Sequence, residues 1–353
     1  MRVIYVTKAV DEANPFVATQ VRWIRALASN DGIEHVLVLS PNIGRVDLPA
    51  NVTLQRLPST WPRRALSLAI RALRTRRREV DFVFVAQGGG PYPALLLPLK
   101  VATRSPLYQW KAHPAVTRRM RFYARWCDDL VFTATKGSFP FALDKVRVVG
   151  HGIDTTQFQP SGAAPDRGLL SIGRISPVKG LEPALRAVAR CRDSFGVTPT
   201  LDVVGPCVAK DLPYLARLQA LAGELDLTDV VRFRGPLEHS EVPELLHRYR
   251  AVLNLSRTAL DKAAAEAMAA GVPVISSNDE TVGALPDDLR DELAVPDGDV
   301  ERLAEVFRAV LSWDDDRRTE VGDRLRDVVV ADHSLESFFG KILAEVRRHR
   351  GAV

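Results

Sequence analysis

Residues 261–275 read DKAAAEAMAAGVPVI, a short Ala-rich helix that runs directly into a strand. Ala and Met favour helix, Asp261 can cap its start, and Gly271 can end it in a left-handed turn. A β-like run at 251–255 precedes this stretch, so the local order is strand, loop, helix, strand. The helix is almost entirely small and apolar, which predicts burial, and Glu266 is the charged residue inside it. A buried carboxylate is costly without a partner, so Glu266 needs either a protein donor or a ligand.

Strand-like and helix-like segments alternate along the chain. Strands are expected at residues 3–7, 35–39, 52–57, 82–86, 107–110, 130–133 and 146–149, with helices at about 14–28 and 63–78. The stretch 160–165 has linker composition, and the pattern then restarts. Strands are expected at 168–172, 200–204, 230–233, 251–255, 272–276 and 293–295, and helices at 181–189, 215–225, 242–249, 301–311 and 334–348. This alternation predicts two α/β domains, each with a parallel sheet covered on both faces. Asp314, Asp315 and Asp316 are expected in a solvated loop.

Charge is divided unevenly along the chain. Residues 1–155 hold 23 Lys and Arg against 11 Asp and Glu, and the remainder holds 25 against 32. The arginines of the basic half concentrate at 63–78 and 118–125. One interpretation is ordinary solvated arginine. The other, which we favour, is attraction to an anionic membrane surface or a lipid diphosphate, with Leu66, Leu68 and Ile70 inserting shallowly. No recognition motif accompanies the charge, so nucleic acid is not an expected partner.

Cysteine spacing and apolar runs narrow the class of protein. Cys127, Cys191 and Cys207 lie far apart, which favours a reducing compartment and argues against a disulfide framework or a zinc site. The first residues lack the apolar length of a signal peptide, and no apolar run is long enough to span a bilayer. We therefore expect a cytoplasmic protein whose basic face lies peripherally on the inner side of the membrane.

The positions of the glycines show which known nucleotide-binding motifs the sequence contains. The turn after the first strand reads TKAVD, so the GxGxxG fingerprint is missing there, and the chain has no GxxxxGK[ST] loop. A nicotinamide-dependent enzyme is therefore a weak alternative. Gly88, Gly89 and Gly90 follow the strand at 82–86, where they either let backbone approach a ligand or form a flexible turn. Both interpretations stay open.

A better ligand site follows the first strand of the second domain, where residues 173–180 read GRISPVKG. Arg174 and Lys179 lie on a loop at the strand's carboxyl end, beside a helix N-terminus. Two cations, loop amides and a helix dipole suit a phosphate or diphosphate. The alternative is a solvated basic loop. Gly205 ends the next strand, again with room for a ligand.

In their order along the chain, these motifs resemble a family 4 glycosyltransferase of the GT-B fold. The resemblance rests on GR and KG within 173–180, VVG at 203–205, FRG at 233–235 and EAMAAGVPVI at 266–275. The run KVRVVGHGID at 145–154, followed by Phe158, looks like that family's domain junction. The resemblance implies two Rossmann-like domains with parallel sheets facing across a cleft. Residues 1–155 would form the acceptor-side domain and 156–333 the nucleotide-sugar-binding domain, and a helix at 334–353 could pack back on the first.

The same match implies roles for residues of the second domain. Arg174 and Lys179 would hold the donor diphosphate and stabilise it as charge develops on the leaving group. Gly173 and Gly205 would line the donor site. Glu266 would accept hydrogen bonds from the ribose hydroxyls, which would explain its burial.

The sequence departs from the family pattern eight places before Glu266, where Thr258 replaces the first of two glutamates. That glutamate normally contacts the donor sugar, and Asp261 or Lys262 is the expected substitute. For Asp261 the alternative, slightly favoured, is a helix cap. Lys262 is electrostatically ill placed at a helix start, which suggests that it meets an anion.

In the first domain, His113 falls where many family members carry a histidine near the transferred sugar; a structural histidine is the alternative. Gly88, Gly89 and Gly90 would face the acceptor. The resemblance further implies a retaining reaction without metal ion or other cofactor.

The expected function is transfer of a sugar from a nucleotide-diphosphate donor to a saccharide or lipid-linked acceptor in polysaccharide biosynthesis. The alternative, prompted by Thr258, is a catalytically inactive GT-B protein that only binds a nucleotide sugar or a glycan.

Overall fold

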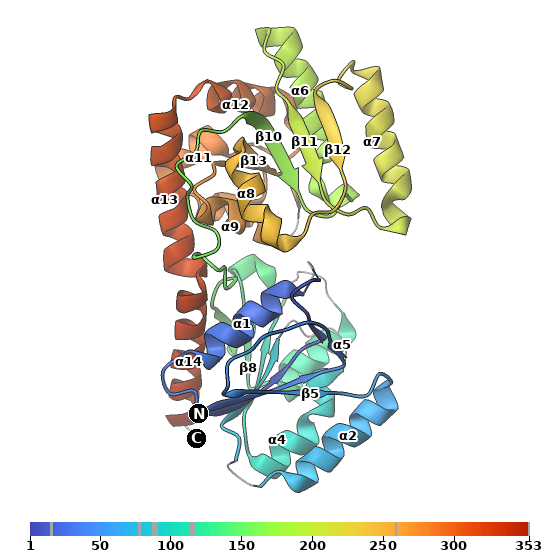
Figure 1. Ribbon diagram of the computed structural model, residues 1–353, viewed down its shortest axis with the longest axis vertical. Helices are drawn as coiled ribbons and strands as arrows, with labels where there is room; N and C mark the ends of the chain where they lie inside the picture. Colours follow the sequence, from blue (N-terminus) through green and yellow to red (C-terminus); the bar gives the residue numbers. More distant parts are fainter. Residues whose placement is uncertain (15–16, 77–78, 87–90, 113–116, 258–259, 352–353) are drawn as a thin grey trace. The chain divides into compact units, whose positions relative to one another are not determined.

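The computed structural model describes residues 1–14, 17–76, 79–86, 91–112, 117–257 and 260–351, and it divides into two compact units (Figure 1). Unit 1 comprises Met1–Gly152 and Leu335–Val353, and unit 2 comprises Ile153–Ser334. Each unit is built on a parallel sheet with helices around it. The α/β class and the two Rossmann-like domains are therefore confirmed.

The main sheet of unit 1 has the strand order β5-β3-β1-β6-β7-β8-β9, with every neighbouring pair parallel. Its strands are β1 (Arg2–Val6), β3 (His35–Ser40), β5 (Val52–Arg56), β6 (Phe82–Ala86), β7 (Leu107–Trp110), β8 (Leu130–Thr133) and β9 (Val146–Val148). A short parallel pair, β2 (Ala9–Val10) and β4 (Asn42–Ile43), lies outside this sheet. All seven strands expected here are present. The chain order reverses between β1 and β6, which is the topological switch point of the sheet.

Helices cover both faces of this sheet because successive strand side chains point to opposite sides. Val3 and Tyr5 of β1 pack in one core cluster, which also contains residues of α1 (Ala18–Ala28) and α14 (Leu335–Gly351). Ile4 and Val6 pack in a second cluster with residues of α2 (Trp61–Arg74), α3 (Tyr92–Leu95) and α4 (Leu97–Thr103). Beside β8 lie α5 (Arg118–Phe122) and the π-helix η1 (Tyr123–Cys127), with Ala124 in a small third cluster.

Two helical details of unit 1 differ from the sequence-based expectation. Helix α1 begins at Ala18 rather than at 14, because the Asn14 carbonyl accepts the Val17 and Ala18 N–H groups in a turn ahead of the helix. Pro15 lies outside the described residues. Helices α3, α4 and α5 were not predicted, and they are only 4, 7 and 5 residues long. Pro98 occupies the first turn of α4, where a missing N–H costs nothing.

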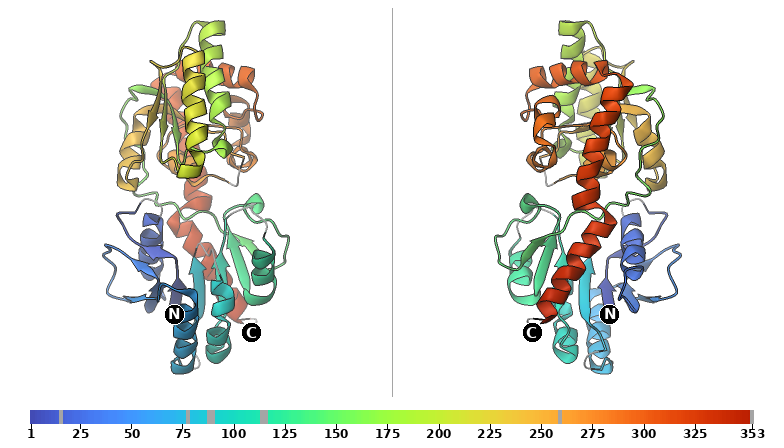
Figure 2. Two further views of the ribbon diagram at one scale, coloured as in Figure 1. Left: turned by 90° about the vertical axis from the view of Figure 1, so that its right-hand side faces the viewer. Right: turned by 90° about the vertical axis from the view of Figure 1, so that its left-hand side faces the viewer.

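The C-terminal helix α14 completes the core of unit 1 (Figure 2). Its Phe338 ring stacks 4.5 Å from the ring of Trp23 in α1 and lies near Trp110 of β7. The Trp23 indole N–H donates to the Gly152 carbonyl at 3.0 Å, at the last residue of the unit's first segment. Helix α14 therefore seals the core around Trp23, although it begins at Leu335, 183 positions after Gly152 in the sequence.

We predict that Phe338→Ala destabilises unit 1 by about 3–5 kcal/mol, because it empties a fully buried aromatic site between Trp23 and Trp110. Urea unfolding monitored by Trp fluorescence measures the loss. Glu336→Ala is the control, because Glu336 is exposed and lies two residues before Phe338 on the same helix. It should change the free energy of unfolding little. Equal effects of the two substitutions would contradict the packing of α14.

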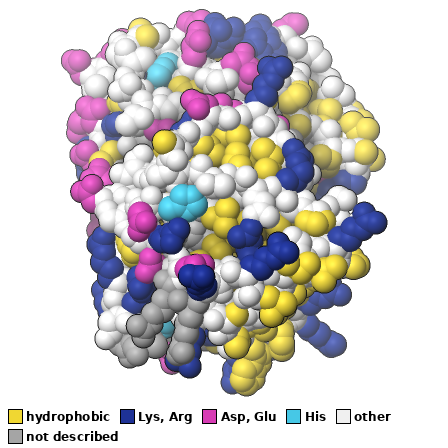
Figure 3. All heavy atoms as spheres, turned by 60° about the horizontal axis from the view of Figure 1, so that its bottom comes forward, with side chains coloured by type: hydrophobic (Ala, Val, Ile, Leu, Met, Phe, Trp, Pro, Cys, Tyr) yellow, Lys and Arg dark blue, Asp and Glu magenta, His cyan; other side chains and the backbone are white. Residues whose placement is uncertain are grey.

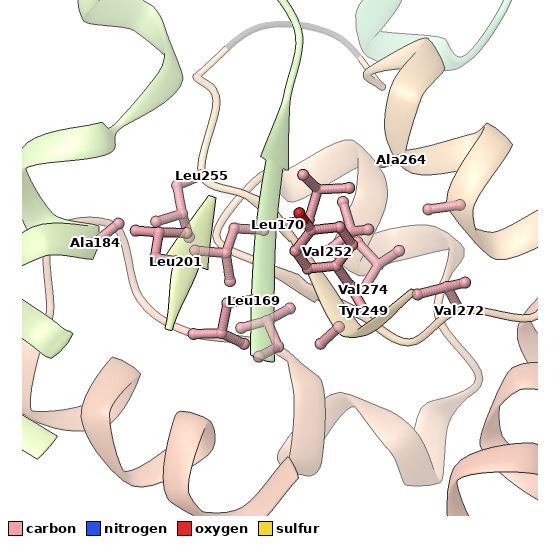
Figure 4. Packing of buried hydrophobic residues seen from close by; sticks show 14 of the residues in the cluster. Leu169, Leu170, Ala184, Leu201, Tyr249, Val252, Leu255, Ala264, Val272 and Val274 are labelled. Carbon is pink, nitrogen blue, oxygen red and sulfur yellow. The ribbon is translucent and has the colours of Figure 1, made fainter. Parts of the chain in front are cut away.

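Unit 2 contains a five-stranded parallel sheet of order β12-β11-β10-β13-β14. The strands are β10 (Arg167–Ile172), β11 (Leu201–Val204), β12 (Val231–Arg234), β13 (Tyr249–Asn254) and β14 (Val274–Ser276). The strand expected at 293–295 is reduced to a single bridge between Ser276 and Ala294. The helices are α6 (Leu181–Phe195), α7 (Leu212–Glu224), α8 (Val242–His247), α9 (Lys262–Ala269), α10 (Asp279–Ala284), α11 (Asp287–Leu293), α12 (Val300–Ser312) and α13 (Asp315–His333). Figure 4 shows strand side chains of this core between Ala184 of α6 and Ala264 of α9.

Helix α9 is the Ala-rich segment at 262–269, and it is buried as expected. The Asp261 carboxylate caps it by accepting the Ala263 N–H at 3.2 Å, and Gly271 follows its end with φ +70°. Helix α13 crosses this end so closely that a Cβ on Gly322 would lie 2.1 Å from the Gly271 carbonyl oxygen. The Arg326 guanidinium of α13 donates to the Ala269 carbonyl, one of the acceptors left open at the end of α9. Small residues on two helices thus allow α9 to pack closely.

The prediction of a solvated loop at Asp314, Asp315 and Asp316 is wrong. Asp314 is the N-cap of α13, whose carboxylate accepts the Arg317 N–H at 2.8 Å, and the other two aspartates occupy its first turn. Three carboxylates at a helix start are stabilised by the free N–H groups and the positive end of the helix dipole. The acidic run therefore marks the start of a helix of 19 residues that sequence patterning missed, because its remaining surface is highly charged.

Candidate active site in unit 2

The candidate site lies at the carboxyl edge of the unit 2 sheet, at its topological switch point. β10 and β13 are neighbours in the sheet although they are not consecutive in the chain. The loop after β10 and the loop after β13 therefore leave the same edge in different directions, which is where ligands bind in open α/β sheets. Residues 173–180 form the first loop, and the second runs from Leu255 to Asp261.

Lys179 and Asp261 connect these two loops by an ion pair. Lys179 ends a short 3-10 turn, Pro177–Lys179, and both side chains are 18% exposed. A Cβ built on Gly173 would lie 3.0 Å from the Lys179 Nζ, so the ammonium group sits directly over Gly173. The Asp261 carboxylate thus caps α9, pairs with Lys179 and accepts a hydrogen bond from the Asn254 side-chain amide at 3.5 Å. The cap interpretation from the sequence is confirmed.

Gly205 allows the loops after β10 and β11 to cross. The Gly173 N–H donates to the Val204 carbonyl at 2.9 Å, and the Ile175 N–H donates to the Pro206 carbonyl at 2.9 Å. Gly205 has φ +147°, and a Cβ there would lie 2.0 Å from the Gly173 carbonyl oxygen. Only glycine fits this crossing. Arg174, between the two hydrogen-bonded positions, is exposed to solvent.

Glu266 lies on α9, one turn into the helix, and is almost fully buried. Its Oε1 accepts a hydrogen bond from His239 Nε2 at 2.8 Å and pairs with Lys262 Nζ at 2.8 Å. Burial by itself would raise the pKa of Glu266. The charge of Lys262 and the hydrogen bond from His239 outweigh it and hold the pKa at about 2, against an ordinary 4.5. Glu266 is therefore a carboxylate that stays ionised although buried, and the anion next to Lys262 is Glu266.

His239 is the residue of this cluster that sequence reasoning missed. It belongs to a one-turn 3-10 helix, His239–Glu241, after β12, whose start is fixed by reciprocal hydrogen bonds between Glu238 and Glu241. Its ring also packs edge-on against Phe158 at 5.6 Å. It lies 27 positions before Glu266 in the chain, so no spacing links the two. The strand order of the sheet and the position of α9 bring them together.

The sequence-predicted residues of unit 2 therefore fall into two adjoining groups. Gly173, Lys179, Gly205 and Asp261 meet at the switch point, and Lys262 and Glu266 meet His239 on the first turns of α9. A pocket of 340 Å³ adjoins the same edge, with Gly180, Tyr214, Arg257, Ser277 and Asp297 among its lining residues.

The candidate residues of unit 1 are described less fully. His113, Gly88, Gly89 and Gly90 lie outside the described residues, as does Thr258 of unit 2. At the carboxyl edge of the unit 1 sheet, Lys111 follows β7. Burial and the nearby charge of Lys8 lower the pKa of Lys111. Two cations therefore lie near the switch point of unit 1.

Two further features concern metal binding and membrane crossing. Within the described ranges, no group of three or more His, Cys, Asp and Glu side chains has a geometry that could hold a metal ion. No helix in this part of the chain has both the length and the apolar character needed to cross a bilayer.

Comparison with known proteins identifies the domain that carries this site. Residues 154–326 match the family model described as glycosyl transferases group 1. Unit 2 carries a glycosyltransferase group 1 domain. Its matched range contains every described residue of the candidate donor site.

Curated relatives of the chain are glycosyltransferases. It is 29% identical over 199 residues to the putative colanic acid biosynthesis glycosyltransferase WcaL of Escherichia coli, covering 54% of this chain and 48% of that protein. It is 33% identical over 163 residues to a D-inositol 3-phosphate glycosyltransferase of Streptomyces scabiei, covering 42% of this chain and 36% of that one. The MMP alpha-(1->4)-mannosyltransferase of Mycolicibacterium hassiacum is 27% identical over 319 residues, covering 80% and 72%. The alignments thus span about half or less of the first two relatives.

Solved structures extend the likeness of fold to the whole chain. HepE of Anabaena, in complex with UDP and glucose, superposes with a TM-score of 0.74 at 15% identity and covers 99% of this chain and all of its own. Sucrose-phosphate synthase of Thermosynechococcus elongatus gives 0.75 at 16% identity over the full length of both. The two Rossmann-like domains therefore match the GT-B architecture.

We predict that Gly205→Ala destabilises unit 2 by about 1–3 kcal/mol, because the new methyl group collides with the Gly173 carbonyl in a backbone conformation that alanine disfavours. Thermal unfolding measures the loss. Gly235→Ala is the matched control, since nothing lies within 4 Å of the added carbon. Equal melting temperatures for the two variants would refute the loop crossing.

We predict that Glu266→Gln lowers the free energy of unfolding by an amount that depends on pH. The folded-state pKa of about 2 lies below the ordinary 4.5, so the carboxylate stabilises the fold above pH 4.5. This contribution is lost as the pH falls from 4.5 to about 2. The variant should be less stable than the parent by about 3 kcal/mol near neutral pH, and the difference should shrink in acid.

Urea unfolding of parent and variant at several pH values on both sides of 4.5 tests this. Glu224→Gln, on the exposed side of α7, is the control and should cost little at every pH. The prediction fails if the difference in free energy of unfolding between the parent and Glu266→Gln is the same at every pH. Ionisation of Glu266 would then not be what stabilises the fold.

Proposed function

We propose that this protein is a family 4 glycosyltransferase that transfers a sugar from a nucleoside-diphosphate donor to a saccharide or lipid-linked acceptor in making a cell-surface glycan. The main support is the position of Lys179. Its ammonium lies over Gly173 at the switch point of a group 1 domain, two positions before helix α6. A cation, a glycine loop and a helix start in one place suit a diphosphate.

The donor diphosphate would bind Lys179 and Arg174. Lys179 pairs with Asp261, so diphosphate binding would exchange one anionic partner for another. The two negative charges of a diphosphate favour that exchange. Exposed Arg174 would approach from the same loop. Charge-assisted contacts of this kind contribute roughly 1.5–3 kcal/mol each.

The ribose hydroxyls would donate to Glu266. A carboxylate accepts two hydroxyl donors only when ionised, and the pKa of about 2 keeps Glu266 ionised at physiological pH. His239 and Lys262 hold this carboxylate from the protein side. We therefore assign His239 as a positioning residue, and Lys262 as the cation that keeps Glu266 ionised.

In the reaction, the bond between the anomeric carbon and the diphosphate oxygen breaks, and a bond to an acceptor hydroxyl oxygen forms. The acceptor proton passes to the departing diphosphate, whose developing charge Lys179 and Arg174 would stabilise. We propose that the reaction retains anomeric configuration and needs no metal ion or other cofactor. His113 would contact the transferred sugar, and Gly88, Gly89 and Gly90 would face the acceptor.

The relatives suggest the substrate class. One acts in colanic acid biosynthesis by its name, another is a mannosyltransferase, and the HepE structure holds UDP and glucose. A uridine or guanosine diphosphate hexose is the natural first donor to test. We place the protein in the cytoplasm, where nucleotide sugars are made.

We predict that Lys179→Met and Glu266→Gln each weaken binding of nucleoside diphosphates by about tenfold or more and abolish sugar transfer, because each removes a charged contact to the donor. Titration calorimetry with UDP and GDP, and donor hydrolysis across a panel of nucleotide sugars, measure the two effects. Arg186→Met removes an exposed cation from the middle of α6 and is the control.

Unchanged nucleotide affinity in Lys179→Met and Glu266→Gln would refute the donor site. Tight, Lys179-dependent binding without turnover for any donor and acceptor would instead favour the second candidate, a catalytically inactive nucleotide-sugar-binding protein. The replacement of a family glutamate by Thr258 is the observation that keeps that candidate in view.

A further inference from the structure

Helix α2 of unit 1 has an apolar face that points away from the core. Leu66, Ile70 and Leu73 recur at helical spacing and are 61%, 39% and 88% exposed. Its other side packs Leu68 and Ala72 into the core. A surface helix ordinarily has one apolar stripe, and that stripe faces the protein. α2 has a second one facing solvent.

Positive charge surrounds this outward stripe. Helix α2 contains no acidic residue, and Arg63 and Arg74 are exposed beside the leucines. A groove of 480 Å³ runs along the helix. Its lining includes the arginines Arg63, Arg71 and Arg74, the apolar Leu66 and Ile70, and one acidic residue, Glu79. The groove therefore combines cations with aliphatic side chains, the combination that a phosphate headgroup with an acyl chain requires.

The neighbouring helical segments α4, α5 and η1 also carry exposed apolar side chains near basic residues. Helix α3 packs against α2, α4 and η1, so these segments are neighbours on unit 1. Val101 of α4 is 75% exposed, and Phe122 and Trp126 at the end of α5 and in η1 are 51% and 65% exposed. The run 118–126 reads RRMRFYARW, with four arginines and no acid. Figure 3 shows hydrophobic side chains beside Lys and Arg on the lower part of the molecule.

Trp61 at the start of α2 is fixed by a contact with Arg64 and is still partly exposed to solvent. The buried Arg64 guanidinium lies 4.2 Å from the centre of the Trp61 ring and donates to the Tyr92 hydroxyl at 3.1 Å. The ring is still 42% exposed. A tryptophan fixed at one edge and open at the other suits the boundary between lipid headgroups and acyl chains.

We propose that α2, its groove, α4 and the α5–η1 segment form a docking face for an anionic lipid bilayer. The exposed aliphatic and aromatic side chains enter the headgroup layer, and the surrounding arginines bind lipid phosphates. Arginines outnumber the one acidic residue of the groove, Glu79, and apolar side chains lie between them, which is the pattern that binds an anionic bilayer. The docking face lies within unit 1 and involves none of the donor-site residues.

Vesicle sedimentation with the full chain tests the proposal. Binding should be strong to vesicles of about one-third phosphatidylglycerol in phosphatidylcholine, weak to pure phosphatidylcholine, and reduced by added salt. Arg63→Glu with Arg74→Glu should lower the affinity at least about tenfold, and Leu66→Ser with Leu73→Ser should do so without changing net charge. Arg186→Glu with Arg347→Glu, two exposed arginines elsewhere, is the charge-matched control.

Tryptophan quenching separates insertion from attraction at a distance. Brominated acyl chains should quench Trp61 and Trp126. The double Phe replacement of these two residues should lose the quenching, because Trp23 and Trp110 are buried and the half-buried Trp313 belongs to unit 2, outside the docking face. Nucleotide binding in solution should be unchanged in all these variants, so failure here is distinguishable from failure of the donor site. The proposal is overturned if phosphatidylcholine binds equally well, if the control reduces binding as much as the α2 variants, or if no quenching occurs.

Discussion

A buried carboxylate on a helix of small residues is the constraint on which the unit 2 site depends. Glu266 is nearly inaccessible to water, and an ionised group there is unstable unless the protein supplies opposite charge and hydrogen-bond donors. Lys262 supplies the charge from one turn earlier on the same helix, and His239 supplies a donor from the 3-10 helix that follows the edge strand β12. The alanines around Glu266 allow α9 to lie close to β13, β14 and α13. The position of the carboxylate is therefore fixed by sheet order, helix packing and electrostatics together.

The diphosphate side of the site depends on backbone proximity rather than on charge alone. Because Gly205 carries no side chain, the loop after β11 can touch the loop after β10, and Lys179 can lie over Gly173. Asp261 then serves two purposes, since it caps α9 and holds Lys179 at the switch point. The pair brings a cation and the start of a helix to one place, and such an arrangement would lower the ordering cost of the proposed diphosphate binding.

Sequence patterning predicted most of the fold because parallel strands in a covered sheet are short, continuous apolar runs. Seven strands of unit 1 and the order strand, helix, strand around α9 follow from such runs. It missed α13, whose surface is so charged that no apolar stripe stands out. It also missed α3, α4, α5, α10 and α11, which are too short to show a helical period. Motif and chemistry together singled out Lys179, Asp261 and Glu266, whose roles toward a donor stay predictions. His239 could not be predicted, because its contact with Glu266 arises from strand order rather than from spacing.

Backbone hydrogen exchange in the presence of a nucleoside diphosphate tests the central claim most directly. If a sugar nucleotide binds at the unit 2 switch point, UDP or GDP should slow exchange at the amides of residues 173–180 and at the start of α9. Exchange in the outward stripe of α2 should stay unchanged. Protection that appears elsewhere in the chain while residues 173–180 and 262–266 stay unchanged would contradict the account.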